Sequence, residues 1–453
     1  MENKSLITDE KTVRASDIVP NEQTPPSKEA LNGAFFWLSA FYLVYCARPE
    51  DWIPGLHLLP LAKISGILAI IGFVSSVGKT RRGLRDLPVE AKYLLVIIAL
   101  LFPSALLSPV WKGGAFFKSL DFAKVYVAWV LTFLLVTNFD RLKRLVFLQA
   151  GSVAAISVVS VLKGRSHARL EGVLGGIYSN PNDLAFAIVL SLPFCLAFLL
   201  SAKGVFRKIA WALSMLLMAV ALFLTASRGG FVTLLVAGVV CLWHFGVRGR
   251  RLYLIFAAVV GMTVLLLVAG DRLKDRFFAI SGEDLNGGMV SAYGSYEERR
   301  ELMKIAVHGV IRYPILGLGM HNFPNYSGKW RDVHVAYLQI AVEGGIPILI
   351  LYLLFFWRGF ANLRFLGKVR DLDHETKLLV AALHSSLVGF VVGACFSPEA
   401  YQYFPYFTVG YTSVLVAIVR ERQRANLNRP SMPPLRSDSY GTHTRTSTLT
   451  FSH

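Results

Sequence analysis

The fold is most clearly indicated by residues 183–247, which read DLAFAIVLSLPFCLAFLLSAKGVFRKIAWALSMLLMAVALFLTASRGGFVTLLVAGVVCLWHFGV. The segment holds apolar runs of about 20 residues, the length at which an α-helix spans the hydrocarbon core of a bilayer. A backbone exposed to lipid must satisfy its own hydrogen bonds, so each run is expected to be a helix. A basic connection, Lys203–Lys208, and a short turn at Arg228 separate the runs. The segment therefore predicts three consecutive membrane-spanning helices.

The same pattern extends over most of the 453 residues. Hydrophobic residues make up 54% of the chain and charged residues 17%, a composition that excludes an ordinary soluble enzyme. We predict an all-α, polytopic transmembrane helix bundle of about 12 spans with one long, partly helical periplasmic loop. The predicted spans are 33–47, 59–78, 91–110, 119–138, 142–162, 183–201, 207–226, 229–247, 251–270, 335–357, 378–396 and 402–420. The first is short and ends at Arg48-Pro49, so an interfacial or re-entrant helix is the alternative there.

The net charge of +18 indicates orientation in a membrane. Basic clusters occupy every second connection, at 79–85, 141–144, 203–208, 248–251 and 358–370. The positive-inside rule places these connections and both termini in the cytoplasm. Nucleic acid is not an expected partner, because the basic residues do not alternate with aromatic residues as in RNA-binding modules.

The predicted organisation has three parts, which are a cytoplasmic N-terminal tail at 1–32, a transmembrane domain at 33–420 and a disordered basic cytoplasmic tail at 421–453. The periplasmic loop, 271–334, belongs to the transmembrane domain and is longer than a simple helix connector. Within it, a capping box at Ser295-Tyr296-Glu297-Glu298 starts a predicted amphipathic helix that Tyr313-Pro314 ends. The four cysteines lie far apart in apolar runs without ligand spacing, so neither a metal nor a cofactor is predicted.

Two arginines lie at outward-facing connections. Arg228 follows a span almost directly, where a charge is costly without an anionic partner, although an arginine can also extend to lipid phosphates. Gly229, with the glycine after it, lets another backbone or a ligand approach closely. Arg169 precedes the turn that holds Asn180 and Asn182, which cap the next span. A capped helix N-terminus favours bound anions, but Arg169 can equally pair with Glu171 or with a head group.

His334 stands where the long loop enters the tenth predicted span. A histidine there can act as a base near neutral pH, although a lone interfacial histidine is often simply hydrogen-bonded. Glu343 lies about half a helical rotation away and roughly 13 Å deeper, so it cannot orient His334 unless the glycine pair that follows breaks the helix.

Together these segments resemble the O-antigen ligase superfamily, which includes O-antigen polymerases and protein O-oligosaccharyltransferases. The similar patterns follow one another in order: Arg169-x-x-Gly172 with Asn180-Pro181-Asn182, Ser227-Arg228-Gly229-Gly230, Glu298-Arg299 with Pro314-x-x-Gly317-x-Gly319, and His334-x-x-Tyr337-Leu338 with Glu343-x-Gly345. The opening Tyr45-Cys46-Ala47-Arg48-Pro49-Glu50-Asp51-Trp52 also looks like that of ligase-like members. One departure is Val335, where the family usually has Asn.

The resemblance implies a metal-independent, inverting glycosyltransferase that moves a glycan from an undecaprenyl pyrophosphate carrier to an acceptor hydroxyl at the periplasmic face. The acceptor would be lipid A core, a polysaccharide or a protein, in envelope or exopolysaccharide biosynthesis. His334 is then the catalytic base, and Arg169, Arg228 and Arg299 bind pyrophosphate or glycan, with Asn180, Asn182, Gly229, Tyr337 and Glu343 in support. Arg299 has the alternative of being only solvated in a loop helix.

Two other functions stay open. A polymerase of the same superfamily shares these patterns, and a lipid-linked glycan transporter would also need many spans and basic groups facing a phosphate. The transporter is less favoured, because no inverted repeat is visible and the polar residues concentrate on one side of the membrane.

Overall fold

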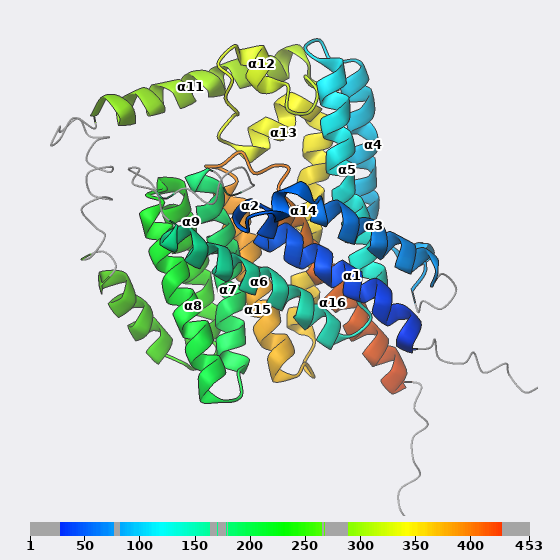
Figure 1. The fold of residues 1–453 in the computed structure, drawn as a ribbon, viewed down its shortest axis with the longest axis vertical. Coiled ribbons are helices and arrows are strands. Elements are labelled where there is room, and N and C mark those ends of the chain that lie inside the picture. Colours follow the sequence, from blue (N-terminus) through cyan, green and yellow to red (C-terminus); the bar gives the residue numbers. More distant parts are fainter. Residues whose placement is uncertain are drawn as a thin grey trace, which may run out of the picture.

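The computed structural model describes residues 28–76, 82–163, 170, 178, 180–264, 267 and 289–427 (Figure 1). Most of both predicted tails and the first part of the predicted loop, 271–288, lie outside these residues. Every element of the described part is helical, which confirms the predicted all-α class there.

The helices follow the predicted apolar runs. The first part of the chain forms α1 (Lys28–Ala47), α2 (Pro49–Trp52), η1 (Leu56–Leu58), α3 (Leu61–Val74), η2 (Leu84–Asp86), α4 (Val89–Leu106), α5 (Lys112–Leu135) and α6 (Phe139–Leu162). The middle forms α7 (Pro181–Ser201), α8 (Val205–Leu224), α9 (Arg228–Cys241), the π-helical η3 (Leu242–Val247) and a helix at Tyr253–Val264. The last part forms α11 (Met289–Arg312), α12 (Phe323–Ser327), α13 (Ala336–Gly344), α14 (Ile346–Lys368), α15 (His374–Gly393) and α16 (Tyr403–Leu427).

Several of these helices can cross a membrane, so the chain is a multi-pass membrane protein. Seven of the described helices are long and apolar enough, namely α4, α6, α7, α8, α9 continued by η3, α14 and α15. Three shorter apolar helices are Asn32–Ala47, Leu61–Val74 and Tyr253–Val264. The total of about 12 spans stays a prediction, because several apolar runs are shorter than the length needed for a span.

The predicted basic clusters gather at one end of the bundle. Arg82 pairs with Glu421 at 2.7 Å, and Lys143 pairs with Glu375 at 2.6 Å. The first pair joins the connection before α4 to the end of α16, and the second joins the start of α6 to the start of α15. The alternation of the connections therefore agrees with the prediction, and the assignment of this end to the cytoplasm stays a prediction.

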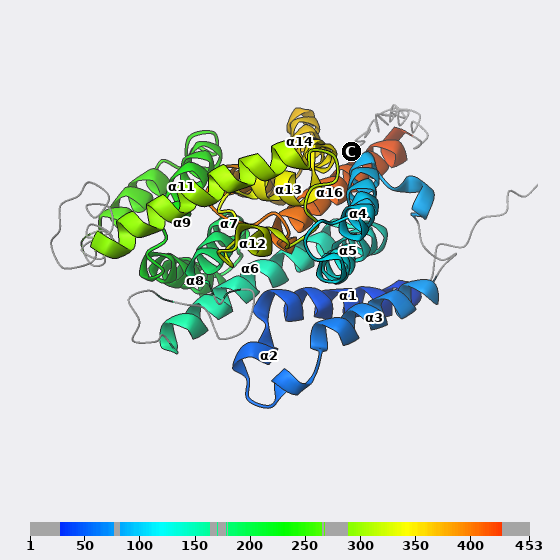
Figure 2. The ribbon, with the colours of Figure 1, turned by 90° about the horizontal axis from the view of Figure 1, so that it is seen from above.

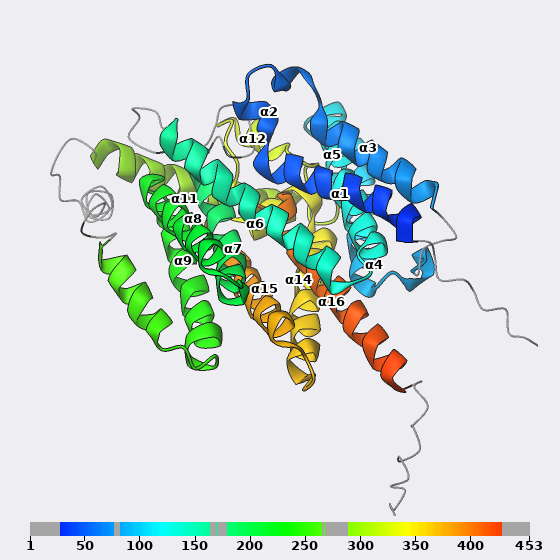
Figure 3. The same cartoon turned by 60° about the horizontal axis from the view of Figure 1, so that its bottom comes forward.

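The bundle has inclined and steep helices. In Figures 1 and 3, α1, α3 and α6 cross the bundle obliquely, whereas α8, α9, α14 and α15 run along it. The core is apolar, with buried polar side chains paired between helices. Asn362 of α14, for example, donates a hydrogen bond to Glu90 of α4 at 3.0 Å.

The other end of the bundle is covered by α11, α12 and α13. Figure 2, seen from above, shows α11 crossing over the helix ends. Its apolar face packs on the segment that follows it, and the small core between them holds Leu302, Ala306, Leu318, Phe323, Val333 and Val342. This confirms the predicted amphipathic helix and its end before Tyr313-Pro314, but the predicted start at Ser295 is wrong, since α11 begins at Met289.

The structure also corrects the predicted span 335–357. The chain forms two helices there, α13 and α14, with a break at Gly345. Gly345 has a φ of 84°, and a Cβ at this position would lie 2.2 Å from the carbonyl oxygen of Ile315. Ile346 N donates to the Pro314 carbonyl at 2.8 Å. The helix is thus interrupted because the 314–319 segment passes through the break and binds the backbone on both sides.

Candidate functional site

A pocket of about 780 Å³ lies beneath α11, at the end of the bundle opposite the basic clusters. His334, Val335, Cys395 and Phe396 form one wall. The other wall is a face of α11 made of Arg299, Arg300, Met303, Lys304, Val307, His308 and Ile311. The pocket therefore combines basic groups, two histidines and an apolar surface, which suits an amphipathic anion.

The segment that carries His334 is fixed to the end of α15. Ala336 N donates to the Ala394 carbonyl at 2.8 Å, and the Tyr337 hydroxyl donates to the Val391 carbonyl at 2.8 Å. These bonds give Tyr337, one of the predicted supporting residues, a positioning role next to His334.

His334 is held in a form that can accept a proton. Its Nδ1 lies 2.9 Å from the Asp332 carbonyl oxygen, which can only accept, so Nδ1 carries the hydrogen and Nε2 has a free lone pair in the neutral ring. Burial lowers the pKa of His334, and the neighbouring Arg299 lowers it further, so the ring is neutral near pH 7. The Asp332 carbonyl supplies the orienting bond in this chain, where Val335 replaces the usual Asn.

Arg228 and Arg299 lie close together. Burial lowers the pKa of Arg299, and the charge of Arg228 adds to this effect. Arg299 Nε is buried without a hydrogen-bond partner. Neither arginine forms an ion pair with a carboxylate in the part of the chain that the structure describes. Two guanidinium groups held near each other in this way are typical of a site that binds an anion.

The N-termini of α7 and α9 meet beside Arg228. The Asn180 side chain caps α7 by accepting from Asn182 N at 2.9 Å. Ser227 caps α9, and its hydroxyl donates to Asn182 Oδ1 at 2.8 Å. Asn180 therefore fixes the start of α7, and Asn182 joins it to the helix that begins with Arg228. The predicted residues Arg169 and Glu171 lie outside the described residues, but Leu170 N donates to the Leu224 carbonyl at 2.9 Å, close to this junction.

Gly229 and Gly230 allow two close contacts between helices. A Cβ on Gly229 would lie 2.9 Å from Phe396 Cβ, and one on Gly230 would lie 2.8 Å from Ala185 Cβ. The glycine pair therefore brings the start of α9 against α7 and against Phe396, which is itself part of the pocket wall. The groups that approach these glycines closely in this structure are protein side chains.

Glu343 is buried away from His334. Its Oε1 accepts from Phe323 N at 3.3 Å, and its carbonyl accepts from Gly319 N at 2.9 Å. Burial raises the pKa of Glu343 to about 8, so the carboxyl is protonated at neutral pH. Its contacts hold the turn at 317–323 and so support the loop beneath α11.

Some residues near the pocket were not identified from the sequence. Asp332 orients His334 through its carbonyl, and its carboxyl Oδ1 is buried without a hydrogen-bond partner. Arg300, Lys304 and His308 line the pocket from α11. Their spacing of four residues, on one helical face, was the signal available in the sequence.

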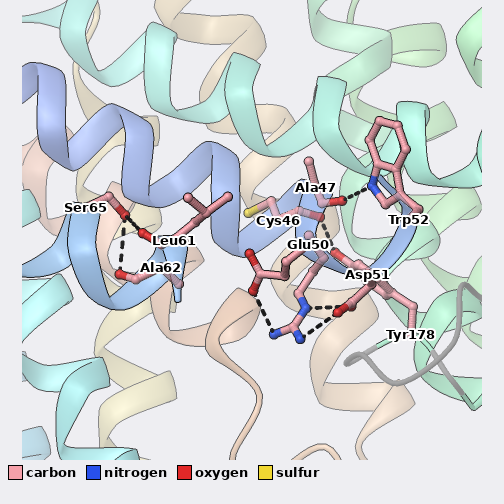
Figure 4. A network of polar contacts seen from close by, with 10 residues as sticks. Cys46, Ala47, Glu50, Asp51, Trp52, Leu61, Ala62, Ser65 and Tyr178 are labelled. Carbon is pink, nitrogen blue, oxygen red and sulfur yellow. Dashed lines mark hydrogen bonds and ion pairs between the residues drawn. The ribbon is translucent and has the colours of Figure 1, made fainter. Parts of the chain in front are cut away.

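The arginine in the motif near the N-terminus has a different environment. Arg48 forms two hydrogen bonds with Asp51, at 2.8 and 3.1 Å, and lies 3.8 Å from Glu50. Figure 4 shows the surrounding network, in which Trp52 donates to the Ala47 carbonyl and Tyr178 donates to the Cys46 carbonyl. Arg48 is therefore neutralised within the protein, which distinguishes it from Arg228 and Arg299.

No group of three or more His, Cys, Asp or Glu side chains is arranged to hold a metal ion within the described residues. The charged side chains of the pocket are arginine, lysine and histidine. These groups bind phosphate directly as donors.

Most of the residues that line the pocket lie in a segment that matches a known family, whereas Cys395 and Phe396 lie outside it. Residues 213–353 match the O-antigen ligase family. The predicted resemblance is thereby confirmed, and the O-antigen ligase match includes Arg228, Arg299, His334, Tyr337 and Glu343. It indicates a membrane enzyme of the O-antigen ligase or polymerase type that transfers glycosyl groups. No curated protein matches the chain.

Proposed function

We propose that the protein is an inverting glycosyltransferase that moves a glycan from an undecaprenyl pyrophosphate carrier to an acceptor hydroxyl at the periplasmic face of the bacterial inner membrane. The observation that carries the proposal is a set of three side chains: two arginines that have no carboxylate partner among the described residues, and a neutral histidine whose Nε2 can accept a proton. The arginines can bind the anionic part of the donor, and the histidine can accept the proton of the acceptor hydroxyl.

In the proposed step, His334 Nε2 removes the proton of the acceptor hydroxyl as its oxygen attacks the anomeric carbon. A new bond forms from this oxygen to the carbon, and the bond from the carbon to the pyrophosphate oxygen breaks. The electron pair of the broken bond stays on the pyrophosphate, where Arg228 and Arg299 stabilise the growing charge, with Arg169 as a predicted third donor. Attack opposite the leaving group inverts the anomeric configuration. These groups perform each part of the step without a metal or cofactor.

The pocket also supports an amphipathic donor. Met303, Val307 and Ile311 are exposed apolar side chains on the face of α11 that carries Lys304 and His308. A polyprenyl chain would contact the apolar residues while its pyrophosphate meets the basic ones. The acceptor, whether lipid A core, a polysaccharide or a protein, would enter from the side of His334.

The test uses the purified full-length protein with a carrier-linked glycan and an acceptor. We expect His334→Ala to lower single-turnover transfer by roughly a hundredfold to ten-thousandfold, the range for general base catalysis, while donor affinity changes little. His57→Ala, at an exposed histidine of η1 far from the pocket, is the control and should transfer at the parental rate. Transfer by His334→Ala within a few-fold of the parent would show that His334 is structural.

The same assay separates the alternatives. A polymerase would extend the carrier-linked glycan when a second carrier-linked repeat is the only acceptor, whereas a ligase would need the distinct acceptor. A transporter would move the donor across vesicle membranes and form no new glycosidic bond. The lack of a visible inverted repeat in the sequence favours an enzyme over a transporter.

A further inference from the structure

A second pocket, of about 560 Å³, lies at the end of the bundle opposite the candidate active site. It is formed where α9 passes into η3 and where α14 ends and α15 begins. Its basic side chains are Arg248, Arg251, Arg364 and Lys377, with His244, His374 and His384. The transfer reaction uses none of these residues.

The charge of this pocket is not neutralised by a carboxylate among the described residues. No Asp or Glu is among the described residues that line it, and its arginines and lysine form no ion pair with a described carboxylate. The nearby acidic residues of the α15 start are engaged elsewhere. Asp373 accepts from Thr376 N at 3.1 Å and lies 3.6 Å from Arg422, whereas Glu375 pairs with Lys143.

The local structure holds the basic groups together. His244 Nε2 and His384 Nδ1 are 3.1 Å apart, which joins η3 to α15. Arg251 lies 3.3 Å from His374 Nε2, which joins the connection after η3 to the start of α15. The π-helical turn of η3 shifts the register at the end of α9, and such turns are frequent at functional sites.

The surroundings place the pocket at the depth of lipid head groups. Trp243 beside His244, Tyr253 after Arg251 and Trp357 beneath Arg364 are exposed aromatic side chains. Exposed tryptophan and tyrosine are typical of the membrane interface. The pocket floor is apolar and includes Leu363, Leu366 and Val380. An occupant with both a phosphate and acyl chains fits this combination better than a free anion.

We propose that this pocket binds the phosphate head group of an anionic phospholipid in the membrane leaflet opposite the candidate active site. Arg251, Arg364 and Lys377 donate to the phosphate oxygens, and the acyl chains lie along the exposed apolar surface of η3 and the helix Tyr253–Val264. The inference does not depend on the proposed function. Its consequence is that a bound lipid holds α9 against α14 and α15, and the other ends of α9 and α15 lie beside the candidate active-site pocket.

The test measures phosphatidylglycerol bound to the full-length protein by native mass spectrometry, with phosphatidylcholine and inorganic phosphate as comparison ligands. The double variant Arg251→Gln, Arg364→Gln should bind phosphatidylglycerol about tenfold more weakly than the parent. The double variant Arg207→Gln, Lys208→Gln removes the same charge from the start of α8, outside the pocket, and should stay within twofold of the parent.

Three results would overturn the proposal. They are equal losses in both double variants, equal binding of phosphatidylcholine and phosphatidylglycerol, or complete displacement of phosphatidylglycerol by millimolar inorganic phosphate. If the pocket variant does not fold, Lys377→Gln alone takes its place, with weaker phosphatidylglycerol binding expected and unchanged binding counting against the site.

Discussion

Replacing Gly345 by alanine tests the helix break that positions the loop beneath α11. The residue has a φ of 84°, where a side chain is strained, at a cost of about 1–3 kcal/mol. The new Cβ would also lie 2.2 Å from the Ile315 carbonyl oxygen, and overpacking of this kind costs a further 1–3 kcal/mol or so. We therefore expect Gly345→Ala to lower the free energy of unfolding by about 2–6 kcal/mol.

The control is a glycine within α14, the helix that follows the break. Gly367, near the end of α14, has no atom within 4 Å of an added Cβ. Gly367→Ala is therefore expected to stabilise the protein slightly, by about 0.5–1 kcal/mol, because alanine restricts the unfolded chain and favours the helix.

The measurement is unfolding in mixed detergent micelles, followed by tryptophan fluorescence, together with the transfer assay. Gly345→Ala should lose transfer along with stability, since the 314–319 segment that crosses the break also supports the turn bound by Glu343. If Gly345→Ala unfolds within about 0.5 kcal/mol of the parent, below the cost of one strained residue, the break is not a fixed feature of the fold.

Other predictions concern the site and its orientation. In Arg299→Gln, the acid limb of the pH profile of transfer should move to higher pH, because Arg299 lowers the pKa of His334 and the base form of His334 exists only above that pKa. An unchanged acid limb would show that Arg299 does not influence the protonation of His334. Arg228→Lys should lose most activity at normal expression, since an ammonium cannot replace a planar fork of donors, and near-normal activity would make Arg228 a general basic anchor. When single cysteines are introduced at positions 287 and 365, an impermeant thiol reagent should label position 287 and not position 365 in spheroplasts. The opposite labelling pattern would show that the orientation in the membrane is the reverse of the predicted one.

The helical architecture was predictable because the bilayer constrains the backbone so strongly. Apolar runs must become helices, and basic connections mark one end of the bundle, so the pattern of residues 183–247 is sufficient to place α7, α8 and α9. The break at Gly345 was not predictable in the same way. It depends on residues 314–319, which approach through tertiary contacts that no local periodicity records.

The candidate site likewise has features that could be predicted from the sequence and features that could not. Arg228 and His334 were singled out by their positions at a predicted membrane interface, whereas Arg299 and the roles proposed for all three residues were implied by the resemblance to the O-antigen ligase superfamily. The contact of Gly229 with Phe396 was not, because the two residues are far apart in sequence. The role of Asp332 was missed for another reason, since it acts on His334 through a backbone carbonyl, which every residue possesses.

The charges in the pocket explain why the site is ready for an anion before one binds. Arg228 raises the cost of the charge on Arg299, and Arg299 raises the cost of a charge on His334. A pyrophosphate between the arginines would remove the first cost and would also favour protonation of His334, which is the form that the histidine reaches as it takes the acceptor proton. In the proposed reaction, donor binding and proton transfer are therefore coupled through Arg299. A neutral side chain at this position would leave His334 more basic in the empty enzyme but less responsive to the donor.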